Sequence, residues 1–135
     1  MELTSRYKLK KPGGNDYINV EVLNENTVTI DREMEKHEKL LGRLYAAPIR
    51  VTLASSGWTG SSAPYAQTVS VSGIKAEDNL VLVSQLADGA SLDTQKAYNK
   101  AFGIVASGTG KTGNGKVTFK VYKKPAIDIV VGLKL

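Results

Sequence analysis

The segment Gly108-Thr109-Gly110-Lys111-Thr112-Gly113 contains the Gly-Lys-Thr triplet with which a phosphate-binding P-loop ends. The full motif has another glycine five residues before Gly110, and this chain has Val105 there. A P-loop also needs a helix directly after its lysine, so that the helix N-terminus faces the phosphates. A strand over residues 116–122 is predicted instead. We therefore predict a glycine-rich hairpin that joins strands at 103–106 and 116–122, with positive φ angles in the turn at Gly113-Asn114-Gly115.

Few side chains are available for catalysis or metal binding. The chain has no cysteine and one histidine, His37, which lies in a predicted helix. Carboxylates after Pro48 are few, and each fits a local role in a turn, a cap or a strand: Glu77, Asp78, Asp88, Asp93 as the cap and Asp128. They show no pairing of the glycosidase kind, and one imidazole without a thiolate needs a carboxylate cluster to hold a metal. We expect no enzyme, no metal and no cofactor.

Basic residues cluster near the end of the chain. The formal net charge is +5, from 18 Lys and Arg against 13 Asp and Glu. Residues 1–48 hold eight of each sign, so the excess belongs to residues 49–135. Lysines beside Tyr122 could bind single-stranded nucleic acid, but a solvated strand face explains them better: Lys120, Lys123 and Lys124, with Lys111 and Lys116. We expect no nucleic-acid partner and take these lysines as a surface that meets an anionic envelope.

Two aromatic residues lie in a long polar connection between predicted strands. Trp58 and Tyr65 belong to the segment 55–65, which is rich in Ser and Gly. Exposed rings in such a loop stack on sugars or on partner proteins. The same rings could instead close one end of a β-sandwich. Both interpretations are open at this point, and the first makes Trp58 and Tyr65 candidates for surface contact.

A heptad pattern marks the first part of the chain. Residues 24–45 predict a helix, and residues 18–22 fit either a short strand or the start of that helix. Spacings of four and three connect a row that we call the seam: Leu23, Thr27, Ile30, Met34, His37, Leu41 and Leu44. The seam indicates either a coiled coil or a helix packed on its own core. Glu33 and Glu38 would repel each other in a parallel bundle.

The rest of the chain predicts a β domain. Strands are expected at 49–53, 67–71, 80–86, 103–106, 116–122 and 127–135, with one short helix at 94–102 that Asp93 caps and Gly103 ends. In residues 117–121 apolar and polar side chains alternate, so one sheet face should be buried and the other exposed. The expected fold is mainly β: an extended arm and a helix in 1–48, then a small antiparallel β-sandwich-like module in 49–135.

Composition sets the cellular context that we expect. The lack of cysteine excludes disulfides, and no apolar run approaches the ~20 residues that a membrane helix needs. The first residues lack the pattern of a signal peptide. These features predict a soluble protein made in a cytoplasm, without membrane insertion.

Two stretches resemble tail-fibre and baseplate appendage proteins of phages and phage-tail-like particles of Gram-positive bacteria. The first carries a Lys-Lys-Pro arm and an Asn-x-Asn helix: Tyr7-Lys8-Leu9-Lys10-Lys11-Pro12, Asp16, Val22-Leu23-Asn24-Glu25-Asn26 and Ile30-Asp31. The second is similar to a small β module at fibre tips: Val51-Thr52-Leu53, Trp58, Pro64-Tyr65, Gln67-Thr68-Val69, Gly73, Lys124-Pro125 and Asp128-Ile129. No shaft repeats separate the two, so a short appendage is expected.

The resemblance implies a non-enzymatic virion protein that assembles in the bacterial host cytoplasm. It implies a homotrimer whose N-terminal arm docks on other tail proteins, with Tyr7, Leu9 and Pro12 as the arm's docking residues. The β module would face outward and contact a glycan of the host cell surface. A carbohydrate-binding module and a head or collar decoration protein are the alternatives.

Overall fold

The computed structural model describes all 135 residues. The chain divides into two compact units, Met1–Ala46 and Ala47–Leu135, which we call unit 1 and unit 2. Two α-helices of 26 and 15 residues and eight strands of two to six residues make the chain mixed α/β. The expectation of a mainly β chain is wrong in this respect, because both helices extend beyond the ranges predicted for them.

Unit 1 is a small hairpin followed by a long helix. Strands β1 (Glu2–Leu3) and β2 (Lys10–Lys11) pair antiparallel, so the arm is folded back on itself rather than extended. Helix α1 (Val20–Tyr45) begins after Asn19, whose side-chain oxygen accepts a hydrogen bond from the Val22 N–H at 3.0 Å. Residues 20–22 are therefore helical. Of the two predictions for residues 18–22, a short strand or the start of the helix, the helix is correct from Val20 on.

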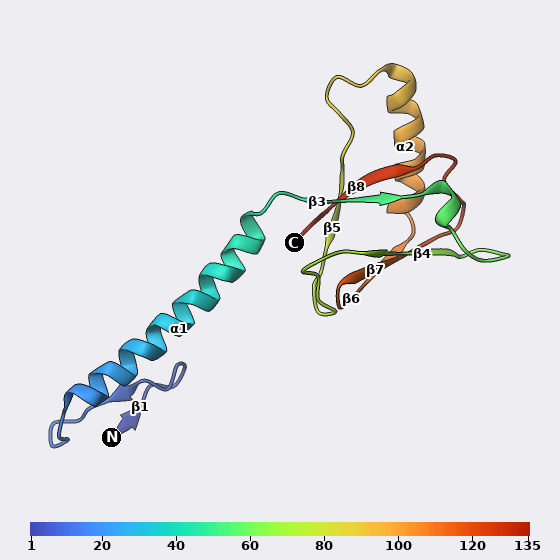
Figure 1. Ribbon diagram of the computed structural model, residues 1–135. Helices are drawn as coiled ribbons and strands as arrows, with labels where there is room; N and C mark the ends of the chain where they lie inside the picture. Colours follow the sequence, from blue (N-terminus) through green and yellow to red (C-terminus); the bar gives the residue numbers. More distant parts are fainter. The chain divides into compact units, whose positions relative to one another are not determined.

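Unit 2 contains two antiparallel sheets of three strands each. The first has the order β3-β8-β5, with β3 at Ile49–Leu53, β8 at Ile129–Lys134 and β5 at Val81–Ser84. The second has the order β4-β7-β6, with β4 at Tyr65–Ser70, β7 at Lys116–Val121 and β6 at Thr109–Gly113. The central strand of the first sheet, β8, is the last strand along the chain, and it lies between two strands that precede it (Figure 1).

Helix α2 (Leu92–Ala106) is longer than predicted and begins at a different cap. Ser91, not Asp93, is the N-cap, and its hydroxyl oxygen accepts from the Thr94 N–H at 3.2 Å. The strand predicted at 103–106 is wrong, because these residues form the last turn of α2. Gly103 does not end the helix, since nothing crowds it and Val105, two residues on, is held in the core.

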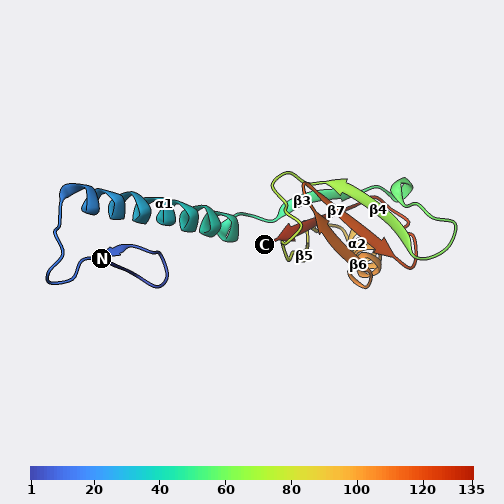
Figure 2. The ribbon, with the colours of Figure 1, turned by 90° about the horizontal axis from the view of Figure 1, so that it is seen from below.

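One apolar cluster holds unit 2 together. It combines the inward side chains of both sheets with one face of α2, which packs against β7 and β8 (Figures 1 and 2): Val51, Leu53, Trp58, Val71, Ile74, Tyr98, Ala101, Val105, Val117, Phe119, Val121, Ile129, Val131 and Leu133. On β7 the alternation is as predicted, with Val117, Phe119 and Val121 buried and Lys116 and Lys120 exposed. The arrangement is broadly that of a β-sandwich with a helix added.

Two buried polar side chains bond to backbone groups that would otherwise lack partners. The Tyr98 hydroxyl accepts from the Gln85 N–H at 2.8 Å and donates to the Val130 carbonyl at 2.7 Å, just beyond the last paired residues of β5 and β8. The Gln67 amide bonds both the N–H and the carbonyl of Ala54, at 3.0 and 2.9 Å. These contacts join segments that lie far apart in the sequence.

Candidate functional site

The seam of α1 is exposed along its whole length. Its five apolar side chains, Leu23, Ile30, Met34, Leu41 and Leu44, are between 46% and 58% exposed, and Val22 is the one buried residue of the helix. A helix of 26 residues normally covers its apolar face. The seam therefore exposes a row of five apolar side chains, interrupted by Thr27 and His37, that another molecule could cover.

The polar residues of the seam are compatible with an apolar contact. The Thr27 hydroxyl donates to the Leu23 carbonyl at 2.9 Å, so this hydroxyl is already satisfied within the helix. Glu33 is paired with Lys36 at 2.9 Å and lies 3.7 Å from Arg32. The hydrogen bond from Lys36 holds the pKa of Glu33 below its usual value. The repulsion expected between Glu33 and Glu38 is reduced, because Glu33 is compensated within its own chain.

The side-chain amide of Asn26 bonds the arm to α1. Asn26 accepts from the Lys10 N–H and donates to the Lys10 carbonyl, both at 2.8 Å, which imitates the pairing of two strands. Lys10 also forms an ion pair with Glu25. The arm consequently runs back beside the N-terminal half of α1 (Figures 1 and 2). Of the predicted docking residues, Leu9 and Pro12 are half-buried there and Tyr7 is 41% exposed.

Tyr7 adds an aromatic ring to the seam. Its ring lies edge-on to His37, with 6.3 Å between the centroids. A groove of about 200 Å³ runs between them and is lined by Tyr7, Ile30, Glu33, Met34 and His37. One predicted docking residue of the arm thus meets three residues of the seam, and the ring of Tyr7 widens the seam on one side.

Removing the Asn26 amide should release the arm. In Asn26→Ala both bonds to Lys10 are lost, and each contributes about 0.5–1.5 kcal/mol. We expect hydrogen exchange at the Lys10 amide to become roughly tenfold faster or more, and trypsin to cut more readily in the arm. Asn24→Ala is the matched control, because Asn24 is an exposed residue of the same helix. Equal exchange in both variants would contradict the role of Asn26.

Trp58 is not a surface residue. Its side chain is 5% exposed and belongs to the core of unit 2, and its ring nitrogen has no hydrogen-bond partner. Of the two interpretations of Trp58, surface contact is wrong and burial against the sandwich is right, because the connection after β3 returns to the sheet, where Thr59 bridges to Ala66. Tyr65 is half-buried, with the Lys124 ammonium 4.8 Å from the centre of its ring.

The predicted basic residues occupy two places. Lys120 stands on the exposed side of β7, while Lys123 and Lys124 follow that strand in a loop, with Lys124 engaged by Tyr65. Lys111 and Lys116 lie on β6 and β7. The structure therefore groups Lys120 with Lys111 and Lys116 rather than with Lys123 and Lys124.

The Asp128 carboxylate accepts a hydrogen bond from the Ser55 N–H at 2.7 Å, which lowers the pKa of Asp128.

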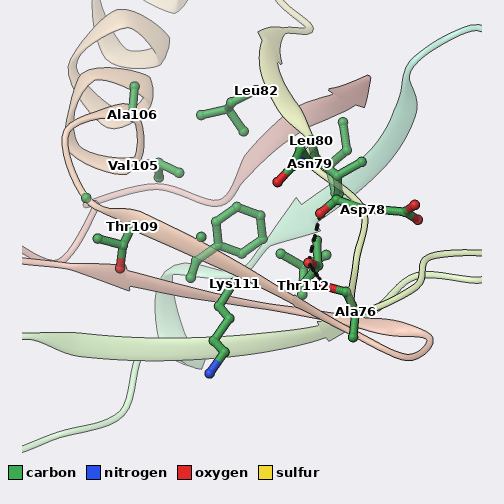
Figure 3. Close-up of a pocket in the computed structure, with 15 residues that line it drawn as sticks. Ala76, Asp78, Asn79, Leu80, Leu82, Val105, Ala106, Thr109, Lys111 and Thr112 are labelled. Atoms are coloured by element: carbon green, nitrogen blue, oxygen red, sulfur yellow. Dashed lines mark hydrogen bonds between the residues drawn. The ribbon is translucent and has the colours of Figure 1, made fainter. Parts of the chain in front are cut away.

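A pocket of about 380 Å³ opens between the two sheets, near the C-terminal end of α2. Leu80, Leu82 and Val105 give it apolar walls, and the Thr112 hydroxyl lies 3.0 Å from the carbonyls of both Ala76 and Asp78 (Figure 3). The lysine at its rim, Lys111, points away from it (Figure 3). No sequence motif could indicate this pocket, because residues between 76 and 133 from several elements form it.

The glycine-rich segment is not a phosphate loop. Residues 109–113 form strand β6, which pairs with β7 from Thr109 opposite Lys120 to Gly113 opposite Lys116. The prediction of a hairpin is confirmed only in part: β6 and β7 form one, but its first strand is the glycine-rich segment itself rather than residues 103–106. Of the three turn residues Gly113-Asn114-Gly115, only Gly115 has a positive φ, 72°.

No protein-family model, no curated protein and no solved structure matches this chain.

Two further properties concern metals and membranes. The structure contains no group of three or more His, Cys, Asp or Glu side chains placed to hold a metal ion. Neither helix combines the length and the apolar character that crossing a membrane requires.

Proposed function

We propose that this chain is a non-enzymatic structural protein of a phage or phage-like tail, a short fibre or baseplate appendage. In this proposal copies associate through the seam of α1, and unit 2 faces outward. The observation that carries it is the exposed seam, with five apolar side chains at least 46% exposed. The resemblance of the arm and of unit 2 to tail appendages supplies the particle and the trimeric state.

Energetics favour association of the seam. Full burial of a Leu, Ile or Met side chain contributes about 1.5–3 kcal/mol. Covering five half-exposed side chains therefore amounts to several kcal/mol per helix, before the cost of association. The internal bond of Thr27 and the pairing of Glu33 with Lys36 remove two obstacles to that burial. Tyr7 and its groove add contact area beside the seam.

A charge placed in the seam should abolish association. We expect the purified protein to sediment as a trimer at micromolar concentration, and Leu41→Glu to sediment as a monomer, because the new carboxylate would be buried. The control is Val28→Glu, which adds the same charge at a 63% exposed position off the seam and should remain trimeric. Circular dichroism checks that both variants keep their helix. If the wild-type protein were still a monomer at about 100 μM, its self-association would be weaker than that of a typical specific complex. That result would refute the proposal.

The position on the particle needs a separate experiment. A head or collar decoration could associate through the same seam, so oligomeric state does not distinguish it from a tail appendage. A map of the assembled particle at residue resolution separates the two, and it also shows whether Leu9 and Pro12 of the arm contact neighbouring proteins. The stand-alone carbohydrate-binding alternative is weakened, because one of the two rings on which it rested, Trp58, is buried, and Lys124 lies over the other, Tyr65.

A further inference from the structure

The outward side of the sheet β4-β7-β6 has an unusual composition, and we call it the lysine face. Its nine positions form three rows across the sheet: Ala66, Lys120 and Thr109; Thr68, Thr118 and Lys111; Ser70, Lys116 and Gly113. Three are lysine, four carry a hydroxyl, and the other two are alanine and glycine. No acidic and no large apolar side chain stands among them, so the face combines positive charge with hydroxyl groups.

The three lysines are free of local partners. None of the ion pairs in the structure involves Lys111, Lys116 or Lys120. The Lys116 stem lies across Gly113, where an added Cβ would come within 3.1 Å of it, so the glycine makes room for this side chain. With strands about 4.8 Å apart and two-residue steps of about 6.7 Å, the lysine Cα atoms form a triangle with sides of roughly 8 to 13 Å.

Protection of a sheet edge does not account for this placement. Lysines that prevent edge-to-edge aggregation stand on edge strands, and β6, which carries Lys111, is one. Lys116 and Lys120 stand on β7, the central strand of the sheet. The five acidic residues of unit 2 lie outside the three strands. The loop with Glu77 and Asp78 does bond to the β6–β7 hairpin, through Ala76 and Thr112. None of the three lysines forms an ion pair with it, so the lysine face suits an anionic ligand.

The hydroxyl groups indicate which kind of anion fits. Thr68 and Thr118 lie with their hydroxyl oxygens 2.8 Å apart. One hydroxyl donates to the other, so one proton of the pair and several lone pairs remain for a ligand. Single-stranded nucleic acid needs successive aromatic rings for its bases, and Tyr122 is the one exposed aromatic residue directly beyond β7. A chain of hydroxylated, charged units matches the face better than a chain of bases.

We propose that the lysine face binds an acidic polysaccharide of a cell surface. Its carboxylates pair with Lys111, Lys116 and Lys120, and its sugar hydroxyls exchange hydrogen bonds with Thr68, Thr109 and Thr118. The inference rests on the proposed function, since it names the ligand class for the outward unit. Each chain contributes one such face, so an oligomer would bind a long polymer with an avidity that exceeds the affinity of a single face.

Binding to polygalacturonate, a linear polymer with one carboxylate per sugar, tests the inference. We expect wild-type protein to bind it at low ionic strength, to release it as salt is raised, and to ignore neutral dextran. The triple variant Lys111→Gln, Lys116→Gln, Lys120→Gln should bind about tenfold more weakly or worse. The control Lys75→Gln, Lys96→Gln, Lys100→Gln removes the same charge from a loop and from α2, and it should bind like wild type.

Three results would overturn the inference: no binding by wild type, an equal loss in both triple variants, or tighter binding of a single-stranded oligonucleotide than of the polysaccharide. Sedimentation of the same samples separates this failure from failure of the proposed function. If the protein is a trimer that does not bind polygalacturonate, only the ligand class is refuted. If it is a monomer, association through the seam is refuted. Thermal unfolding of each variant checks that unit 2 remains folded.

Discussion

Replacing Gly108 with alanine is expected to destabilise unit 2 by about 3 kcal/mol or more. Gly108 connects α2 to β6, and a Cβ at this position would lie 2.0 Å from the carbonyl oxygen of Lys120 on β7. That oxygen is backbone in the central strand of a sheet, so it cannot turn aside as a flexible side chain would. Either the α2–β6 connection or the β6–β7 ladder must shift, and both carry core side chains.

The same substitution five residues earlier should have the opposite sign. Gly103 is inside α2, and a Cβ there has no other group within 4 Å apart from the helix itself. Gly103→Ala should stabilise unit 2 by about 0.5–1 kcal/mol, because glycine is a poor helix former. Denaturant unfolding of both variants measures the pair, and unchanged m-values would show that the native and denatured states keep their exposed surface. Equal stability of the two variants would contradict the close approach at Gly108.

Tyr98→Phe should cost unit 2 about 1–3 kcal/mol, although it removes a single oxygen atom. The hydroxyl satisfies the Gln85 N–H and the Val130 carbonyl, and Tyr98 is 8% exposed. Without the hydroxyl, both backbone groups lose this partner, and each of the two hydrogen bonds contributes about 0.5–1.5 kcal/mol. The measurement is the free energy of unfolding, together with hydrogen exchange at the Gln85 amide, which should accelerate.

Tyr122→Phe is the matched control for this prediction. Tyr122 is 67% exposed, so loss of its hydroxyl should change the free energy of unfolding by less than about 0.5 kcal/mol. A Tyr98→Phe variant as neutral as Tyr122→Phe would contradict the role of this hydroxyl, and Tyr98 would be an ordinary core side chain.

Local patterns in the sequence predicted most of the elements. The heptad spacing located α1, and alternation located β7 with the correct face inward. The glycine at 103 led to a wrong end for α2, since a glycine ends a helix only where the chain must turn, and here the core contact of Val105 continues it. The arm hairpin was missed, because two strands of two residues each leave no periodic signal.

The candidate surfaces were predictable only in part. The seam follows from spacing alone, but the attachment of the arm by Asn26 joins residues 16 positions apart through one amide. The lysine face depends on register: a shift of one residue between β6 and β7 would turn Lys111 inward. The burial of Trp58 depends on a tertiary contact, the return of its loop to β4, which no local pattern in the sequence indicates.

The position of β8 has a consequence for synthesis of the protein. Strands β3 and β5 do not bond each other, and each pairs only with β8, which follows every other strand of unit 2. On the ribosome, the first sheet therefore cannot form until residues 129–134 have emerged, and core residues such as Leu53 stay uncovered until then. Unit 1 is a compact unit of its own that precedes unit 2 along the chain. Its helix α1 is complete first, so under the proposed association nascent chains on one message would meet through their seams while unit 2 is still unfolded.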